Sequence, residues 1–190
     1  GGMSLTATIR RATRGDARAI ARVHVESWRS AYAGIIPDRV MVDMSVDDKA
    51  LFWRRMVERA GMRGAVLVAS VTEAGSPGAE IAGFASCAAA SGGAADYDGE
   101  VQTLYVHPDW QEQGLGRALL CGTFQALKGA GYRSAFVWVL AQNPSRFFYE
   151  AMGGRQVGTR TEALWGAELP EIAYGWPDLD VALAGCGGGN

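Results

Sequence analysis

Polar and apolar residues alternate along this chain with two different periods, and the change of period separates predicted helices from predicted strands. Near the start, apolar or aromatic side chains recur every four residues from Ile20 to Tyr32, so they share one face of a helix. Thr13 and Asp16 form a capping pair before this helix, and Gly34–Pro37 ends it and opens a short second helix. The amphipathic spacing of a third predicted helix is carried by Trp53, Met56, Val57 and Ala60.

The middle of the chain then changes to the pattern of strands. Two apolar runs, Ala65–Val71 and Ile81–Cys87, are joined by a connector rich in turn residues and predict a hairpin. After a glycine- and alanine-rich stretch over residues 91–99, Glu100–Val106 predicts another strand. The remaining predicted elements are a helix over 114–128, a strand over 133–140, a short helix over 144–152 and strands over 154–164 and 171–176.

These elements predict the layout of a sheet. A strand, a helix and a strand follow one another between Val101 and Leu140, and such a βαβ unit makes its two strands parallel. The second of these strands is apolar along nearly its whole length, which is typical of a central strand covered on both faces. The hairpin makes the other strands antiparallel. The sequence therefore predicts an α/β (α+β) fold with a mixed, mostly antiparallel sheet, a central parallel pair of strands and helices on both faces.

The length of the chain indicates one domain, because typical domains run to about 100–200 residues and this chain has 190. We expect this domain over residues 3–184, with Gly1 and Gly2 as the remnant of an expression tag and residues 185–190 as a glycine-rich tail. Hydrophobic residues make up 48% and charged residues 20% of the chain, which fits a packed core.

Charge and cysteine content exclude several classes of protein. Lys and Arg total 18 against 20 Asp and Glu, so the formal net charge of −2 does not favour a dedicated nucleic-acid binder. No apolar run approaches the ~18 residues of a membrane helix. The set Cys87, Cys121 and Cys186 is odd and widely spaced, and with two histidines it predicts neither a disulfide framework nor a zinc site. We therefore expect a cytoplasmic protein with reduced cysteines and no metal, which binds neither nucleic acid nor membranes.

The most specific chemical signal is the run Gln111-Glu-Gln-Gly-Leu-Gly-Arg117, which stands between a predicted strand and a predicted helix. Gly114 and Gly116 lack a Cβ, so the backbone there can approach a ligand closely. The first N–H groups of a helix have no internal partner and carry the positive end of its dipole, so they bind phosphate oxygens. The spacing is neither GxGxxG nor GxxxxGK[ST], which argues against a dinucleotide fold and a P-loop. The alternative is a plain turn with a glycine-softened helix start.

This run and a second one, Asn143-Pro-Ser-Arg-Phe-Phe-Tyr149-Glu-Ala-Met-Gly153, resemble two motifs of the GNAT superfamily, the coenzyme A-dependent N-acetyltransferases. That family carries [QR]-x-x-G-x-[GA] after its fourth strand and an N…FYE…G segment after its fifth. The order of elements and the pair of N-terminal helices fit as well, so the resemblance covers roughly residues 8–176. The resemblance implies the GNAT fold, acetyl-CoA as cosubstrate, and a slot between the two parallel strands, which splay apart.

The resemblance also implies which residues bind acetyl-CoA. The backbone around Leu104–Val106 pairs with the pantetheine arm as an added strand would, and Gln111–Arg117 hold the pyrophosphate. Asn143 contacts the arm or the surroundings of Tyr149, and its place before Pro144 also makes it a good helix N-cap. The complete implied set is Leu104, Tyr105, Val106, Gln111, Glu112, Gln113, Gly114, Leu115, Gly116, Arg117, Asn143, Arg146 and Tyr149.

Transfer to an amine requires a base, because an alkylamine with a pKa near ~10 is protonated at neutral pH. Glu100 is our candidate, since it opens the strand that leads to the loop, where relatives often carry a carboxylate. Strict alternation places Glu100 on the same face as Leu104 and Val106, which a bulge would change. The alternative for Glu100 is an exposed strand-end glutamate, with Asp96, Asp98 or a water molecule as the base.

The leaving thiolate needs a proton donor, and Tyr149 is our candidate because its phenol stays protonated at pH 7. Its position on the short helix turns it about 100° from the core face that includes Phe148. Trp28 and Tyr32, by the same resemblance, lie on the substrate side. The alternative for all three aromatic residues is a place in the core, which is the commoner fate of aromatic pairs at helical spacing.

Together these observations predict an N-acetyltransferase that moves an acetyl group from acetyl-CoA to a primary amine of a small molecule or peptide by direct attack. One alternative is a GNAT-fold module that binds acyl-CoA without turnover, as a sensor or interaction partner. Another is a nucleotide-binding protein of a different fold. The resemblance is also compatible with a homodimer.

Overall fold

A mixed sheet organises the molecule over residues 4–91 and 96–187, which the computed structural model describes. Its strands are β1 (Leu5–Arg11), β2 (Ala65–Glu73), β3 (Glu80–Ala89), β4 (Gly99–Val106), β5 (Ala135–Leu140), β6 (Arg155–Leu164) and β7 (Ala167–Trp176). The α-helices are α1 (Ala17–Ala31), α2 (Asp38–Asp43), α3 (Val46–Arg59), α4 (Leu115–Gly129), α5 (Ser145–Ala151) and α6 (Leu179–Cys186). The strand order is β1-β2-β3-β4-β5-β7-β6, with β4 and β5 parallel and the other neighbours antiparallel.

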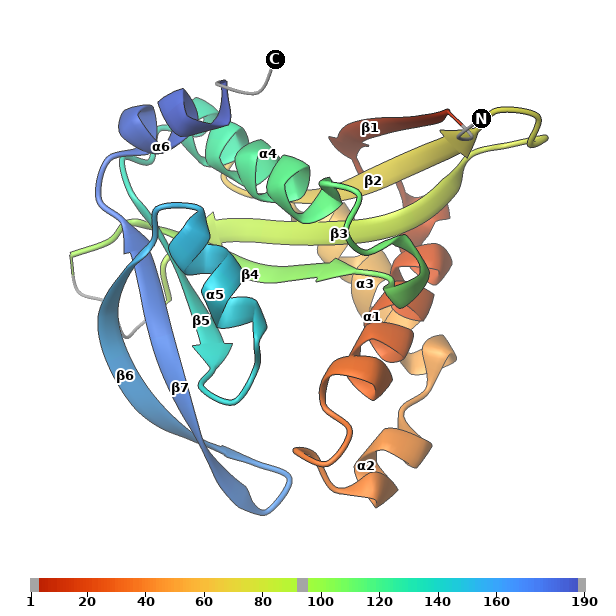
Figure 1. Cartoon of the computed structure of the whole chain (residues 1–190), viewed down its shortest axis with the longest axis horizontal. Coiled ribbons are helices and arrows are strands. Elements are labelled where there is room, and N and C mark those ends of the chain that lie inside the picture. Colours follow the sequence, from red (N-terminus) through yellow and green to blue (C-terminus); the bar gives the residue numbers. More distant parts are fainter. Residues whose placement is uncertain (1–3, 92–95, 188–190) are drawn as a thin grey trace.

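Helices cover both faces of this sheet (Figure 1). On one face α1 and α3 pack over β2 and β3, where Ile20, Trp53 and Phe84 are almost completely buried. On the other face α4 packs over β2, β3 and β4 through buried side chains that include Leu119 and Phe124, and α6 lies against α4. The predicted fold class, a mixed sheet with one parallel pair and helices on both faces, is confirmed.

The N-terminal helices begin where the sequence predicts. The carboxylate of Asp16 accepts the N–H of Thr13 at 2.7 Å, and the short 3-10 turn that holds this pair leads into α1. The hydroxyl oxygen of Ser45 accepts the N–H of Asp48 at 3.3 Å at the start of α3. Such caps satisfy N–H groups that the first turn of a helix leaves without a partner. These caps fix where α1 and α3 begin. Helix α1 then crosses the sheet, and its C-terminal end lies near β4 and β5.

The parallel strands β4 and β5 pair over a very short distance. Their ladder holds only the pairs Gly99–Ala135 and Glu100–Phe136, after which the two strands diverge. At this vertex a Cβ on Gly99 would lie 2.7 Å from the carbonyl oxygen of Ser134, so only glycine fits there. Beyond the vertex β4 keeps its pairing with β3, and the edge that faces β5 is left open. The predicted splaying is therefore present, and the open space between the two strands is called the β4–β5 gap below.

The C-terminal segment differs from its prediction. Residues 185 and 186, expected in a glycine-rich tail, end helix α6, and Cys186 forms a disulfide with Cys121 of α4. The prediction of unpaired cysteines is therefore wrong for these two residues, whereas Cys87 is a buried free thiol. The cysteines are 65 positions apart, and the sequence gave no local signal of the bond because only the packing of α6 along α4 brings them together. The predicted tag remnant at Gly1–Gly2 and the final residues 188–190 lie outside the described residues.

One further boundary differs from its prediction. Strand β7 begins at Ala167 and not at 171, because the chain turns directly from β6 through Trp165 and Gly166, which have φ of 51° and 79°. Two successive residues of positive φ make the tight turn that suits a two-residue hairpin. Among the described residues, none of the helices combines the length and the apolar character that crossing a membrane requires.

Candidate active site

The loop between β4 and α4 presents an unpaired stretch of main chain. A 3-10 turn over Pro108–Trp110 leads into it, and Glu112 and Gly114 have φ of 65° and 78°. The first helical hydrogen bond of α4 runs from the N–H of Ala118 to the carbonyl of Gly114 at 3.1 Å. The N–H groups of Leu115, Gly116 and Arg117 precede this bond in the first turn of α4, and within the described part of the chain they find no protein acceptor. They converge at the positive end of α4, which is an arrangement that binds phosphate oxygens.

The side chains of this loop are arranged less uniformly than its backbone. Gln111, Glu112 and Gln113 are exposed, and the buried Leu115 anchors the start of α4 in the core. The guanidinium of Arg117 donates to the carbonyl of Gly185 in α6 at 2.8 Å and so turns away from the loop in this structure. A Cβ on Gly116 would meet Phe148 of α5 at an ordinary 3.6 Å, so the protein itself does not demand glycine there. The hydrogen-bond donors that this loop presents to a ligand are therefore mainly N–H groups of the main chain.

The edge of β4 that faces the gap carries free backbone groups at alternate residues. The N–H of His107 donates to the carbonyl of Ala82 at 2.7 Å, so the backbone groups of His107 and, two residues earlier, of Tyr105 point toward β3. Those of Leu104 and Val106 point the other way, into the gap, because successive residues of a strand direct their polar groups to opposite edges. Leu104 and Val106 thus have the orientation that an added strand needs, whereas the backbone of Tyr105, also predicted for this role, is used by β3.

Tyr149 lies at one side of the gap. It is 95% buried on α5, with the rings of Phe148, Tyr174 and Trp176 between 5.2 and 6.4 Å away from centroid to centroid. Burial, followed by the charge of Tyr32, raises the pKa of Tyr149 above its usual range, so the phenol is protonated at neutral pH. The hydroxyl of Tyr174 is engaged by Glu150 at 2.8 Å. That of Tyr149 has no hydrogen-bond partner among the described residues.

Tyr32 and Asn143 meet at the other side of the gap. The amide nitrogen of Asn143 donates to the Tyr32 hydroxyl at 3.0 Å, and its amide oxygen accepts the N–H of Ser145 at 2.9 Å. Asn143 thus caps the start of α5, as predicted, while it connects α5 to the end of α1. Burial raises the pKa of Tyr32, and hydrogen bonds with Tyr105 and Asn143 oppose the rise. The structure therefore brings four residues from α1, β4, the β5–α5 turn and α5 around one gap: Tyr32, Tyr105, Asn143 and Tyr149.

Glu100 does not lie where strict alternation places it. The β3–β4 ladder skips one residue between Thr103 and Val101, so Gln102 forms a bulge and Glu100 falls on the face of Thr103 and Tyr105. The predicted shared face with Leu104 and Val106 is therefore wrong.

The surroundings of Glu100 distinguish it from the neighbouring carboxylates. It is partly buried at the vertex, where desolvation raises its pKa against hydrogen bonds from Ser91 and the charge of Arg160. It lies five residues, about 16 Å of extended strand, from Tyr105. Asp98 accepts the N–H groups of Arg133 and Ser134 at 2.9 to 3.2 Å and so fastens the start of β5. That structural role speaks against Asp98 as a base.

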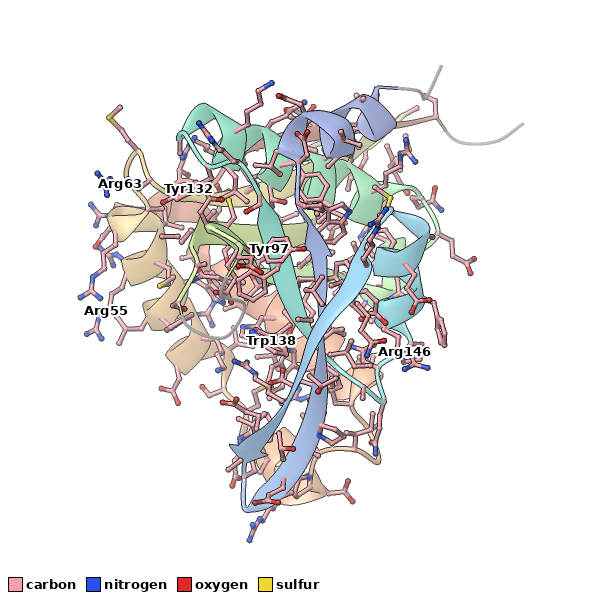
Figure 2. The ribbon with its side chains drawn as sticks, turned by 90° about the vertical axis from the view of Figure 1, so that its left-hand side faces the viewer. Arg55, Arg63, Tyr97, Tyr132, Trp138 and Arg146 are labelled. Carbon is pink, nitrogen blue, oxygen red and sulfur yellow. A yellow bond between two sulfur atoms is a disulfide. The ribbon has the colours of Figure 1, made fainter. Side chains whose placement is uncertain are left out.

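The remaining predicted residues divide between the core and the surface. Trp28 packs edge-on against Tyr32 and Trp165, with centroid distances of 5.1 and 5.3 Å, and its indole N–H is buried without a partner in the described chain. Arg146 lies on the side of the molecule that α5 occupies, with its guanidinium 4.7 Å from the centre of the Phe147 ring (Figure 2). Asp96 is exposed in a turn.

Two features of the site were not predicted from the sequence. Trp165, at the tip of the β6–β7 hairpin, closes the aromatic group around Trp28, and the Trp-Gly pair between two strand-like runs is the signal that points to such a turn. The side chain of Tyr105, considered only for its backbone, stacks on His24 at 5.5 Å and reaches Tyr32. Both residues lie on the α1 side of the sheet, which therefore holds more of the site than the motifs suggest.

A separate cavity of about 490 Å³ lies away from the gap. Its walls come from α1, the ends of β2 and β3 and the turn after β4, and its charged lining includes Arg22, Glu26, Glu80 and His107. Glu26 and His107 form an ion pair across it. Within the described residues no cluster of three His, Cys, Asp or Glu side chains could hold a metal ion.

Comparisons with known proteins identify similar chains. The family model of the acetyltransferase (GNAT) domain matches residues 63–153, which include the loop and all of α5. The uncharacterized N-acetyltransferase YuaI of Bacillus subtilis (strain 168) is 37% identical over 174 residues, which cover 92% of this chain and 95% of YuaI. The PaiA N-acetyltransferase of Thermoplasma acidophilum, solved with coenzyme A, aligns with a TM-score of 0.64 at 19% identity over 88% of this chain and 98% of its own. YncA of Salmonella typhimurium, solved with acetyl-CoA, gives 0.65 at 24% identity over 92% and 95%.

Proposed function

The chain belongs to the GNAT acetyltransferase family, and on that premise we propose that it transfers an acetyl group from acetyl-CoA to a primary amine by direct attack on the thioester. The acceptor is an amine of a small molecule or peptide. The observation that carries the proposal is the buried Tyr149 on α5, whose hydroxyl has no partner among the described residues, together with the free N–H groups of residues 115–117 at the start of α4. A diphosphate-bearing thioester that docks on those N–H groups extends along β4 toward Tyr149.

Binding of acetyl-CoA is supported by the main chain on two counts. The pyrophosphate finds free N–H groups and the positive end of α4 at residues 111–117. The pantetheine arm finds the exposed backbone of Leu104 and Val106, with which its amides pair as an added strand would. PaiA and YncA were solved with coenzyme A and acetyl-CoA, respectively, and share this fold. Asn143 lies in the turn before α5, where it bonds Tyr32, and Arg146 follows it in the first turn of α5.

The reaction makes two demands, and we assign one residue to each. The amine must lose a proton, and we assign this role to Glu100, which acts through water because it lies at the vertex and not beside Tyr149. Its raised pKa makes it a better base than an ordinary glutamate at neutral pH. The departing thiolate must gain a proton, and we assign this role to Tyr149, whose phenol is protonated and unpaired. The amine approaches from the α1 side, past Trp28 and Tyr32.

The test combines binding with turnover. Isothermal titration calorimetry with acetyl-CoA measures whether the cosubstrate binds, and ATP serves as the control that a nucleotide-binding protein of another kind would prefer. Release of free thiol from acetyl-CoA is then followed with a panel of amines and amine-bearing peptides. We expect heat with acetyl-CoA and amine-dependent thiol release. Binding with thiol release only at the background rate would identify a non-catalytic acyl-CoA-binding module, and absence of heat with acetyl-CoA would overturn the proposal.

A further inference from the structure

Tyr32 touches both strands that form the β4–β5 gap. It follows the last residue of α1, its N–H donates to the carbonyl of Trp28 at 2.9 Å, and only 6% of its surface is exposed. Its ring belongs to the same cluster as Leu140, the last residue of β5. Its hydroxyl bonds Asn143 in the turn after β5 and lies beside the hydroxyl of Tyr105 from β4. A single side chain from α1 thus stands between the diverging strands.

The bond with Asn143 shows which part of the Tyr32 hydroxyl is free. The amide oxygen of Asn143 already accepts the N–H of Ser145, so the group that faces Tyr32 is the amide nitrogen, which can only donate. The Tyr32 oxygen is therefore the acceptor in that bond, and its own proton has to be given to another group. The hydroxyl of Tyr105 donates to the same oxygen, since this hydrogen bond lowers the pKa of Tyr32 and raises that of Tyr105. Within residues 4–91 and 96–187 the proton of Tyr32 itself therefore has no protein acceptor. Because a buried donor without a partner is costly, the arrangement points to an acceptor on a ligand.

Tyr32 and Tyr149 approach this space from opposite faces of the sheet. Tyr149 belongs to the core beneath α4 and α5, and Tyr32 to the cluster beneath α1 and the β6–β7 hairpin. Their hydroxyls are nevertheless close enough for the charge of one to affect the other. Burial raises the pKa of both, so both are protonated at neutral pH. A thioester in the gap therefore lies between two hydrogen-bond donors, one for each of its two heteroatoms.

We propose that Tyr32 is a catalytic residue that donates a hydrogen bond to the carbonyl oxygen of the bound thioester; this inference rests on the proposed function. When the amine nitrogen attacks the carbonyl carbon, the C=O π pair moves onto oxygen, where the Tyr32 O–H stabilises the charge. When that pair re-forms the C=O bond, the C–S bond breaks and the thiolate takes the proton of Tyr149. The protonated amine loses one proton through water to Glu100 before the attack, and the attached nitrogen loses a second proton to water after it. A proton from the solvent restores Tyr149 once the thiol has left. Nothing is oxidised or reduced, and Tyr32 keeps its proton throughout.

The direct test observes the carbonyl without turnover. Acetyl-CoA labelled with carbon-13 at the carbonyl is bound to the protein, and the isotope-shifted C=O stretch is isolated by difference infrared spectroscopy. We expect this band at lower wavenumber than in free acetyl-CoA, and we expect Tyr32→Phe to return part of the shift. A band that is unchanged by Tyr32→Phe would overturn the inference. The control is Tyr132→Phe, which removes a hydroxyl that bonds the carbonyl of Arg63. Figure 2 shows both residues on the opposite side of the molecule from Arg146 of α5.

Kinetics supply a second readout. Loss of one oxyanion donor typically lowers kcat by ~10²–10³-fold, and we expect Tyr32→Phe to fall in that range while the Kd for desacetyl coenzyme A, which has no carbonyl, changes less than about twofold. A fall in kcat that is matched by an equal loss of coenzyme A affinity would indicate a structural role and would overturn the inference. Tyr132→Phe is expected to keep the wild-type kcat.

A third variant keeps the test valid if Tyr32→Phe does not fold. Incorporation of 3-fluorotyrosine at position 32 retains the ring and the hydroxyl and makes the hydroxyl a stronger donor. We expect the carbonyl band to move further to lower wavenumber, and an unmoved band would contradict the inference. Failure of the inference is distinct from failure of the proposed function, because the latter requires that acetyl-CoA does not bind or that no amine releases thiol.

Discussion

The two sides of the β4–β5 gap are built from different material. On the α4 side the groups that face a ligand are main chain, namely the N–H groups of residues 111–117 and the open edge of β4. On the α1 side they are side chains, with Trp28 in edge-on contact with both Tyr32 and Trp165. A main-chain site suits a cosubstrate whose phosphates and amides never change, whereas a side-chain site can vary with the acceptor. This difference explains why the sequence carries a recognisable motif for the α4 side of the gap and none for the α1 side.

Tyr149 is the exception to this difference, because it is a side chain on the α4 side of the gap. We expect Tyr149→Phe to lower kcat by ~10²–10⁴-fold at pH 7, since a proton donor to the thiolate contributes on that scale. The affinity for acetyl-CoA should change little, because the N–H groups of residues 111–117 remain. Stopped-flow thiol release and calorimetry measure the two quantities.

The matched control is Tyr174→Phe on the same face of the sheet. The hydroxyl of Tyr174 donates to Glu150 and does not face the gap, so this variant should keep near wild-type turnover. If Tyr149→Phe and Tyr174→Phe lose equal activity, the α4 side contributes packing and not acid chemistry.

The α4 side also differs in how it is held together, because a covalent bond joins α4 to α6. We expect reduction of Cys121–Cys186, or the variant Cys186→Ser, to lower the free energy of unfolding by about 2–4 kcal/mol. The physical reason is that the reduced, unfolded chain gains freedom that the cross-link removes. Chemical denaturation with and without a reductant measures the difference.

The free thiol provides the control for that experiment. Cys87 is buried in the core and takes no part in the disulfide, so Cys87→Ala should show the same response to reductant as the wild type. If the denaturation midpoint of the wild type does not change with reductant, the disulfide does not stabilise the packing of α6 on α4. The two sides of the gap would then not differ in this respect.

The sequence anticipated the α4 side better than the α1 side for physical reasons. Residues 111–117 act through a local turn and a helix start, and such features depend on neighbours in sequence. The bond between Tyr32 and Asn143 joins residues 111 positions apart, and only the packed sheet creates it. Pattern reasoning found both residues but had no means to join them.

The errors of the sequence reading have equally specific causes. One bulged residue, Gln102, moves Glu100 to the opposite face, and alternation cannot reveal an inserted residue. Helix α6 is mostly small and apolar residues beside glycines, which resembles a tail until α4 covers it. The strand order and the parallel pair, by contrast, follow from connection rules that hold across folds, and those were correct.

The α1 side should also respond to acid in a way that the α4 side does not. His24 is buried under Tyr105 and accepts the indole N–H of Trp53 at 3.0 Å. Burial, with a smaller contribution from the charge of Lys49, lowers the pKa of His24 from 6.5 to about 4. The unfolded chain therefore binds a proton that the folded chain refuses, so stability is full above pH 6.5 and is lost as pH falls from 6.5 toward 4.

The free energy of unfolding should fall by about 3 kcal/mol near pH 4, which follows from the difference between the pKa of His24 in the unfolded and the folded chain. His24→Gln retains an acceptor for Trp53 and does not titrate, so its unfolding free energy should depend less on pH over this interval. Denaturation at several pH values measures the slope, and hydrogen exchange should show α1 and α3 loosening before α4. Equal slopes in the wild type and the variant would contradict the assignment.

The smallest expected effect tests whether the α4 side truly works through its main chain. Gly114 has φ of 78°, and no atom would meet an added Cβ within 4 Å, so Gly114→Ala brings backbone strain and no clash. The strain amounts to about 1–3 kcal/mol, and the peptide can relieve it by rotating. This rotation should misalign the N–H groups and raise the KM for acetyl-CoA about tenfold.

Gly75→Ala is the matched control, because Gly75 has φ of 85° and equal space in the β2–β3 turn. It should lose similar stability and keep its KM, and if the two variants have the same KM, residues 111–117 do not hold the cosubstrate through their backbone.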